Sequence, residues 1–195
     1  MTRYAWASLG LTLSLVATAT TAWGAPASVI VTTIGHASRL CLIGSPKVQI
    51  GTAVNLANVT GQTIDIASLS DSQTLSTKAT SFDIDFNALC NFSHSVQLSS
   101  DRGGLWRLAT GHVAEAFADG VPYHATLEWG GASTTLEATA LSVTPMNDVL
   151  RVNSPAGGAL VVQFRVDPGA TDKGLGAPLA AGVYQDTITV TLGPQ

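Results

Sequence analysis

The sequence predicts an all-β protein with the architecture of a β-sandwich, and three observations support this prediction. Threonine and serine, which favour strands and turns, make up about a fifth of the chain, and 19 glycines supply further turn positions. Apolar residues recur with a period of two in many short segments that are separated by turn-forming residues. No long stretch carries a convincing helical period. We therefore expect eight or nine short strands packed as two sheets.

Length and composition limit both the size and the class of the protein. The 195 residues amount to one domain, and 46% of them are hydrophobic whereas only 11% are charged. This balance is too apolar for a disordered chain and too poor in charge for a coiled coil. The formal net charge is −4, and the nine basic residues are scattered singly. Because nucleic-acid binding depends on a basic patch that neutralises phosphates, we expect no nucleic-acid partner.

Residues 1–24 are predicted to be a signal peptide. A single basic residue, Arg3, precedes an apolar stretch over 5–17, and small residues then place Ala22 and Gly24 at the −3 and −1 positions of a cleavage site. Cleavage after Ala27 is a close alternative. A membrane anchor is the competing interpretation, but threonines and serines dilute the run and it is short for a span. We therefore expect an exported mature chain without a membrane span.

The segment 25–40 is predicted to be an N-terminal extension of a domain formed by residues 41–195. It contains the β-branched run Ser28–Ile34, which begins almost at the mature terminus and precedes the first cysteine. An apolar strand at a free end either packs within its own domain or is lent to a neighbour as an added strand. An unpaired apolar edge would otherwise be an aggregation hazard. The residues of this run leave both arrangements open.

The two cysteines of the chain, Cys41 and Cys90, support export. Two cysteines in an exported protein most simply form one disulfide. They lie far apart in the sequence and neither belongs to a CxxC motif, so a metal site would need further ligands. We expect a Cys41–Cys90 disulfide, which closes a loop of about 50 residues.

Within the domain, the expected strands follow one another at short intervals. A weak alternation at Val48, Ile50 and Val54 comes first. The later strands are expected at 63–66, 81–86, 93–99, 123–129, 136–143, 160–166 and 183–192. Turn-forming residues separate them, as at 101–104, 130–131, 155–158, 167–169 and 181–182. A short helical piece at 111–118 is the one exception that the pattern allows.

The segment 123–129 places its largest side chains on one face. Tyr123, Ala125, Leu127 and Trp129 alternate with His124, Thr126 and Glu128. Two aromatic rings on a predicted core face favour packing over a sugar-binding patch.

The closing segment 183–192 alternates almost perfectly. Tyr184, Ile188, Val190 and Leu192 share the predicted core face, and the period places Asp186 on the same face. Since a buried carboxylate requires hydrogen-bond donors, we expect Asp186 at the rim of the sandwich, where it accepts hydrogen bonds from turn amides.

Catalytic and metal-binding patterns are weak, so we expect neither an enzyme nor a cofactor. Asp83 and Asp85 share one strand face, whereas a glycosidase needs two carboxyls that face each other across a cleft. No serine lies in a G-x-S-x-G elbow. His112 and His124 could gather a metal with Glu115, but such loose groups are usually solvated side chains.

The C-terminal stretch resembles the closing signature of a known family. Residues 180–192 (AAGVYQDTITVTL) are similar to the last strand of the spore coat protein U domain family, which comprises the subunits of archaic chaperone–usher pili. Cys90 with the following segment Val96–Ser99 and Gly103–Gly104 is similar to the second-cysteine strand of that family, and Cys41 matches its first cysteine. The resemblance spans Cys41–Leu192. One departure is that the segment between the two cysteines is longer than the family leads us to expect.

This resemblance implies an incomplete immunoglobulin-like sandwich that lacks its last strand. In the family, a periplasmic chaperone supplies a strand temporarily, and at the outer-membrane usher the extension of the neighbouring subunit replaces it. The resemblance therefore implies a protein secreted through the periplasm into a cell-surface fibre. Alternate residues of a donated strand enter the groove, so Val29, Val31, Thr33 and Gly35 form the favoured donor register.

Three alternatives stay open at this point. A shift of one residue would bring Ile30, Thr32 and Ile34 into the groove instead. The run Ser28–Ile34 could also be the first strand of a sandwich that is complete in itself. In that case the protein would be a stand-alone secreted binding module that recognises a carbohydrate or a protein.

Overall fold

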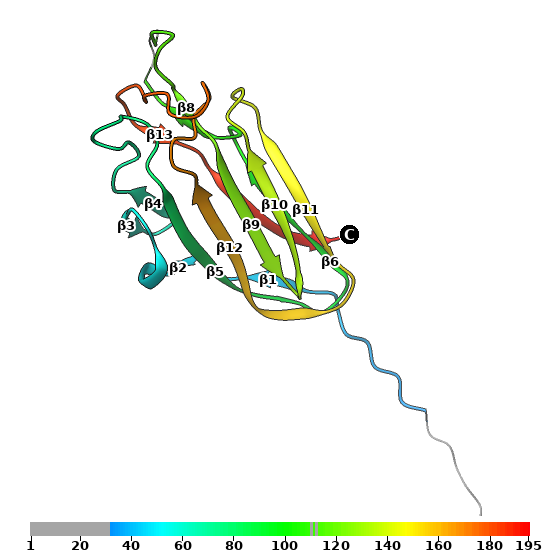
Figure 1. Cartoon of the computed structure of the whole chain (residues 1–195). Coiled ribbons are helices and arrows are strands. Elements are labelled where there is room, and N and C mark those ends of the chain that lie inside the picture. The colour runs from blue at the N-terminus through cyan, green and yellow to red at the C-terminus, as the bar shows by residue number, and fades with distance from the viewer. Residues whose placement is uncertain (1–31, 110, 112) are drawn as a thin grey trace, which may run out of the picture. The chain divides into compact units, whose positions relative to one another are not determined.

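The computed structural model describes residues 32–109, 111 and 113–195. The chain divides into two units, 1–36 and 37–195, and the strands of the described residues lie in the second. The described residues contain no α-helix, so the fold is all-β, as predicted (Figure 1). The predicted signal peptide, its cleavage site and the donor residues Val29 and Val31 lie outside the described residues.

The strands are short, apart from two of eleven residues. In chain order they are β1 (Cys41–Ile43), β2 (Lys47–Val48), β3 (Leu56–Thr60), β4 (Thr63–Ile66), β5 (Thr80–Cys90), β6 (His94–Ser100), β7 (Leu105–Arg107), β8 (Gly120–Val121), β9 (Tyr123–Trp129), β10 (Ala132–Ala138), β11 (Met146–Val152), β12 (Ala156–Val166), β13 (Tyr184–Gln185) and β14 (Ile188–Pro194). One turn of 3₁₀ helix, η1 (Ile50–Thr52), follows β2.

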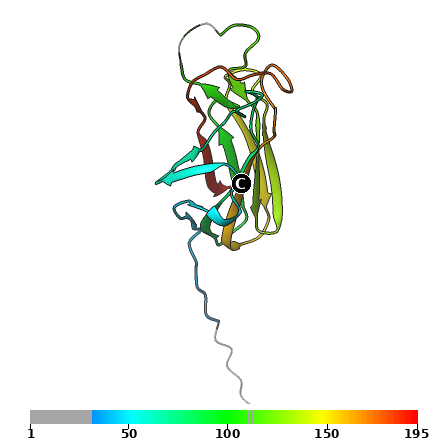
Figure 2. The ribbon, with the colours of Figure 1, turned by 60° about the vertical axis from the view of Figure 1, so that its left-hand side comes forward.

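Two antiparallel sheets form the layers of a β-sandwich-like structure (Figures 1 and 2). The larger sheet has the order β1-β5-β12-β9-β10, and β2 pairs with β5 beside β1. The second sheet has the order β11-β6-β14. Two smaller sheets complete the fold: β13-β7-β8 at one end, and the hairpin β3-β4.

The core lies between the inner faces of the two sheets. Alternate residues of each long strand are buried, because successive side chains of a strand point to opposite faces. Val96 and Leu98 of β6 are completely buried against residues of β5, β9 and β12. Tyr123 and Trp129 are also buried, so the predicted packing role of these aromatic rings is confirmed.

Polar contacts join the sheets at the end where β6 begins. The indole Nε1 of Trp129 donates to Nε2 of the fully buried His94 at 2.6 Å. Since an indole N–H can only donate, this imidazole Nε2 is the acceptor, and its Nδ1 carries the proton that it shares with the Phe92 carbonyl at 2.7 Å. The predicted disulfide is also present at this end: Cys41 of β1 is bonded to Cys90 of β5.

The structure corrects three predictions about secondary structure. The strand expected at 136–143 lies earlier in the chain, as β10, and ends at Ala138. The described residues of the segment 111–118 form a turn instead of a helical piece, in which the Phe117 N–H donates to the Ala114 carbonyl. The closing segment is two strands instead of one, since β13 pairs with β7 whereas β14 pairs with β6. The break falls at Asp186 and Thr187, for a reason that the hydrogen bonds of Asp186 make clear below.

Candidate functional site

On one side of the sandwich, which we call the open side, β1 of the larger sheet comes close to β14 without pairing with it. On the opposite side, β10 of the larger sheet runs beside β11 of the second sheet and closes the layers. On the open side, β14 pairs with β6 along one edge, and among the described residues no strand pairs with its other edge. A strand edge without a partner presents backbone N–H and C=O groups to another chain.

The register of β14 identifies the backbone groups that are free. Ile188 lies opposite Ser100 in the pair β14–β6, and the Asp101 N–H donates to the Thr187 carbonyl at 3.0 Å. Because hydrogen bonds between antiparallel strands involve every second residue, Thr189 and Thr191 direct their backbone groups to β6. The backbone groups of Ile188, and of Val190 and Leu192 after it, therefore face the open edge.

The side chains of the same three residues point into the sandwich but are incompletely covered. Ile188, Val190 and Leu192 contact the core and remain partly exposed, whereas their neighbours Val96 and Leu98 in β6 are fully buried. The core face of β14 was thus predicted correctly. What the sequence did not show is that this face is only partly covered.

The facing edge of the larger sheet shows the same incomplete cover. Ile43 lies on the same, inward face of β1 as Cys41, yet this residue is 39% exposed. Phe86 of β5 and Val48 of β2 also pack against the core while remaining partly exposed. We use the name groove for this set of partly exposed apolar residues on the two sheet edges: Ile43, Val48, Phe86, Ile188, Val190 and Leu192. Partly exposed apolar side chains with an unpaired strand edge between them can accept an added strand.

The described residues that precede β1, 32–40, form no strand. Residues 32–40 are exposed and carry no regular structure, and this range includes Thr33 and Gly35 of the favoured donor register. The C-terminal end of this segment is nevertheless fixed by hydrogen bonds to the side chain of Asn91. The Asn91 Oδ1 accepts from the Leu40 N–H at 2.8 Å, and the Asn91 Nδ2 donates to the Ser38 carbonyl at 2.8 Å. The Arg39 guanidinium lies 5.5 Å from the centre of the Phe92 ring.

Asp186 lies at the rim of the sandwich and accepts five hydrogen bonds, as predicted for this residue. The amides of Arg102, Gly104 and Thr187 donate to it at 3.0, 3.3 and 2.8 Å. The hydroxyls of Ser100 and Tyr123 donate at 2.5 and 2.8 Å.

These contacts explain the break between β13 and β14. The Asp186 carboxylate occupies the position at which β6 turns away, so the chain leaves its pairing with β7 at Gln185 and pairs with β6 from Ile188 onward. Gly104 lets its amide reach the carboxylate, because a Cβ at this position would lie 2.6 Å from the Cβ of Ala140. Burial of the phenol raises the pKa of Tyr123, so its hydroxyl keeps its proton and remains a donor to Asp186.

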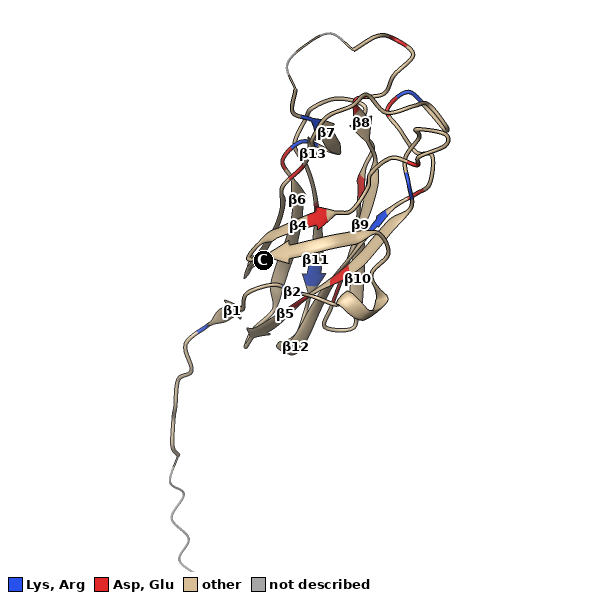
Figure 3. Cartoon of the chain, turned by 90° about the vertical axis from the view of Figure 1, so that its left-hand side faces the viewer, with Lys and Arg blue, Asp and Glu red and all other residues tan. Residues whose placement is uncertain are grey.

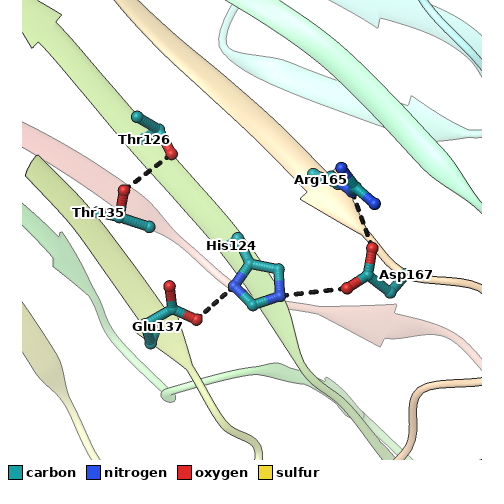
Figure 4. Close-up of polar contacts among 6 residues, drawn as sticks. All are labelled: His124, Thr126, Thr135, Glu137, Arg165 and Asp167. Carbon is teal, nitrogen blue, oxygen red and sulfur yellow. Dashed lines mark hydrogen bonds and ion pairs between the residues drawn. The ribbon is translucent and has the colours of Figure 1, made fainter. Parts of the chain in front are cut away.

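A polar cluster lies on the outer face of the larger sheet (Figure 4). His124 of β9 is bracketed by two carboxylates: Nδ1 contacts Glu137 of β10, and Nε2 lies 3.3 Å from the Asp167 carboxylate. The Arg165 Nε donates to Asp167 at 2.8 Å. Each contact joins side chains of one exposed sheet face, so the cluster pairs neighbouring strands and presents a polar surface to water.

The residues considered for a metal or for catalysis are placed as follows. His124 lies beside Glu137 and Asp167, and His112 is outside the described residues. Within the part of the chain that the structure describes, no group of three or more histidine, cysteine or acidic residues could hold a metal ion. Asp83 and Asp85 lie on the outward face of β5, as their alternation predicted.

The remaining observations concern membranes and known proteins. No helix among the described residues is long and apolar enough to cross a membrane. No protein-family model matches the chain, and no curated protein is detectably similar to it in sequence.

Proposed function

We propose that the protein is a structural subunit of a secreted surface fibre, in which a strand from a neighbouring subunit inserts beside β14. The observation that carries this proposal is the edge of β14. Ile188, Val190 and Leu192 carry both the backbone groups that face the unpaired edge and the apolar side chains that are partly exposed. An inserted strand would satisfy both at once, completing an immunoglobulin-like sandwich.

The donated strand is the run Ser28–Ile34 of another copy. Its residues are β-branched, as strand formation favours, and the described residues 32–40 are exposed and pair with no strand of their own chain. In the favoured register Val29, Val31 and Thr33 face the groove, and Gly35 continues this face. Burial of two valine side chains contributes roughly 3–6 kcal/mol before any hydrogen bond is counted. This gain favours assembly over a solvated extension.

Such a subunit does no chemistry, and its partners are proteins. A periplasmic chaperone holds the groove until the outer-membrane usher receives the subunit, and neighbouring subunits then complete it. Secretion through the periplasm also fits the Cys41–Cys90 disulfide, which forms in an oxidising compartment. The resemblance of residues 180–192 to the spore coat protein U domain family supports the same function.

Paired substitutions on the donor strand and on the acceptor strand test this proposal. In the mature chain, a charge at Val31 (Val31→Asp) should block polymerisation, measured by light scattering. The matched control Thr32→Asp changes the adjacent residue, which faces away from the groove, and should polymerise. The Val31→Asp chain should still bind a fluorescent peptide of residues 28–35, because its own groove is intact. Val190→Asp should abolish this binding, whereas Thr191→Asp on the outer face should retain it.

The outcomes separate the proposal from its alternatives. A reversed result on the donor strand, with Thr32→Asp blocking assembly, would establish the register of Ile30, Thr32 and Ile34. A mature chain that stays monomeric and binds no peptide would refute the proposal. It would favour a sandwich complete in itself, acting as a secreted module that binds carbohydrate or protein.

A further inference from the structure

The hairpin β3–β4 crosses the open side of the sandwich. The hairpin follows β2 and η1 in the chain and begins next to the edge of the larger sheet. Figure 3 shows it extending over the open side towards the second sheet. Its two strands pair with each other and, in the part of the chain that is described, with no other strand. An isolated hairpin of two strands is at best marginally stable in water. The hairpin must therefore be held in place by its contacts with the sandwich.

Those contacts are apolar and incomplete. Leu56, Ile64 and Ile66 pack against the core while remaining partly exposed. Asp65, which lies between the two isoleucines, is exposed on the other face. The hairpin thus covers apolar surface without bonding to the free edge of β14. An inserted strand would gain both kinds of contact at this edge.

A single residue joins both ends of the hairpin. Asn55 has a φ of 63°, and its carbonyl accepts from the Ala67 N–H at 2.9 Å. Its side-chain Nδ2 donates to the Ser68 carbonyl at 2.6 Å and to the Thr80 hydroxyl at 2.8 Å. Because these bonds lie at the base, the hairpin can move away from the core without breaking a ladder between the sandwich strands.

We propose that the hairpin β3–β4 is a hinged cover of the groove, which shields apolar surface in the free subunit and moves aside when a strand enters. This inference rests on the proposed function, because it concerns the same groove. It assigns a role to the unusually long segment between the two cysteines. Entry of a strand is then limited by opening of the cover, so weakening the contacts of the cover should accelerate entry.

The test measures how fast the fluorescent peptide of residues 28–35 binds to the full mature chain carrying Val31→Asp, which keeps it monomeric. Adding Ile64→Ser and Ile66→Ser should raise the association rate about tenfold or more, on the scale of half-burying two isoleucine side chains. Asp65→Ser, on the exposed face of the same strand, is the matched control and should leave the rate unchanged. Tryptophan fluorescence and an intact disulfide verify that each variant is folded.

A second variant and a second measurement guard against a folding defect. Residues 56–66 can be replaced by Gly-Gly, because Asn55 and Ala67 are already hydrogen-bonded, and this variant should also bind faster. Hydrogen exchange of the hairpin amides in the parent chain should increase when the peptide is bound.

Each result has a distinct meaning. Unchanged or slower binding by both hairpin variants, or hairpin amides that become more protected, would overturn the cover and leave the proposed function standing. Failure of every chain to bind the peptide would refute the proposed function, and the cover with it.

Discussion

Removal of the Asp186 carboxylate is expected to destabilise the protein more than any other change at its rim. The substitution Asp186→Ala takes the acceptor away from five donors. Tyr123 and Ser100 are each only 1% exposed, so their hydroxyls have little access to bulk water. The three amides lie at the rim, where water can replace part of the lost bonding.

The size of the effect follows from the two buried hydroxyls. A buried donor that loses its acceptor costs about 1–3 kcal/mol, so the two together predict a loss of roughly 2–6 kcal/mol in the free energy of unfolding. Tyr123→Phe removes one donor and should cost only about 1 kcal/mol. In the double variant Tyr123→Phe, Asp186→Ala the effects should not add, because the phenol then no longer needs an acceptor.

Urea unfolding followed by tryptophan fluorescence measures these differences. Trp106 and Trp129 are both buried and report loss of the core. Asp101→Ala is the control, because Asp101 is exposed and adjacent to the same turn, and its effect should stay within about 0.5 kcal/mol. A loss below about 1 kcal/mol for Asp186→Ala, with an unchanged dependence on urea, would refute the structural role that we assign to this residue.

Two further predictions concern the disulfide and the tyrosines. Replacing Cys41 and Cys90 by serine should lower the free energy of unfolding by about 4 kcal/mol, since the bond joins residues 49 apart. Two thiols that can be alkylated in the purified protein before reduction would contradict the bond. Burial raises the pKa of Tyr184 to about 12 and also raises the pKa of Tyr123, so both phenols favour the folded state while neutral. The contribution of Tyr184 is complete below the unfolded pKa of about 10 and is lost as the pH rises through its folded pKa of about 12, so the urea midpoint should fall in that window and fall less in Tyr184→Phe. A midpoint that does not change there would contradict the burial of the Tyr184 phenol.

The elements predicted best are those whose burial follows a strict period of two. The segments 63–66, 81–86 and 123–129 all lie in strands with the expected inward faces. Alternation identifies them because a half-buried strand must place every second side chain in the core. The Cys41–Cys90 pair was predictable for a different reason: with two cysteines in the chain, only one intramolecular bond is possible.

The elements that were missed depend on contacts between distant segments. The alternation of 183–192 continues through Asp186, and only the hydrogen bonds from the 100–104 turn divide it into β13 and β14. His124 was considered with His112 and Glu115, whereas the register of β9 and β10 places it opposite Glu137. Neither the turn nor the register leaves a local signal in the sequence.

Local periodicity and composition predict that the chain forms strands, which residues of those strands face inward and that the two cysteines are bonded. The pairing of the strand edges, in contrast, follows from the tertiary structure alone. β14 has the alternation of a fully packed strand, yet no strand of the described residues pairs with its outer edge, and its inner face is only partly covered. Pairing depends on which segments, tens of residues apart, reach the same edge, and a strand that no segment reaches has the same local sequence as one that is paired.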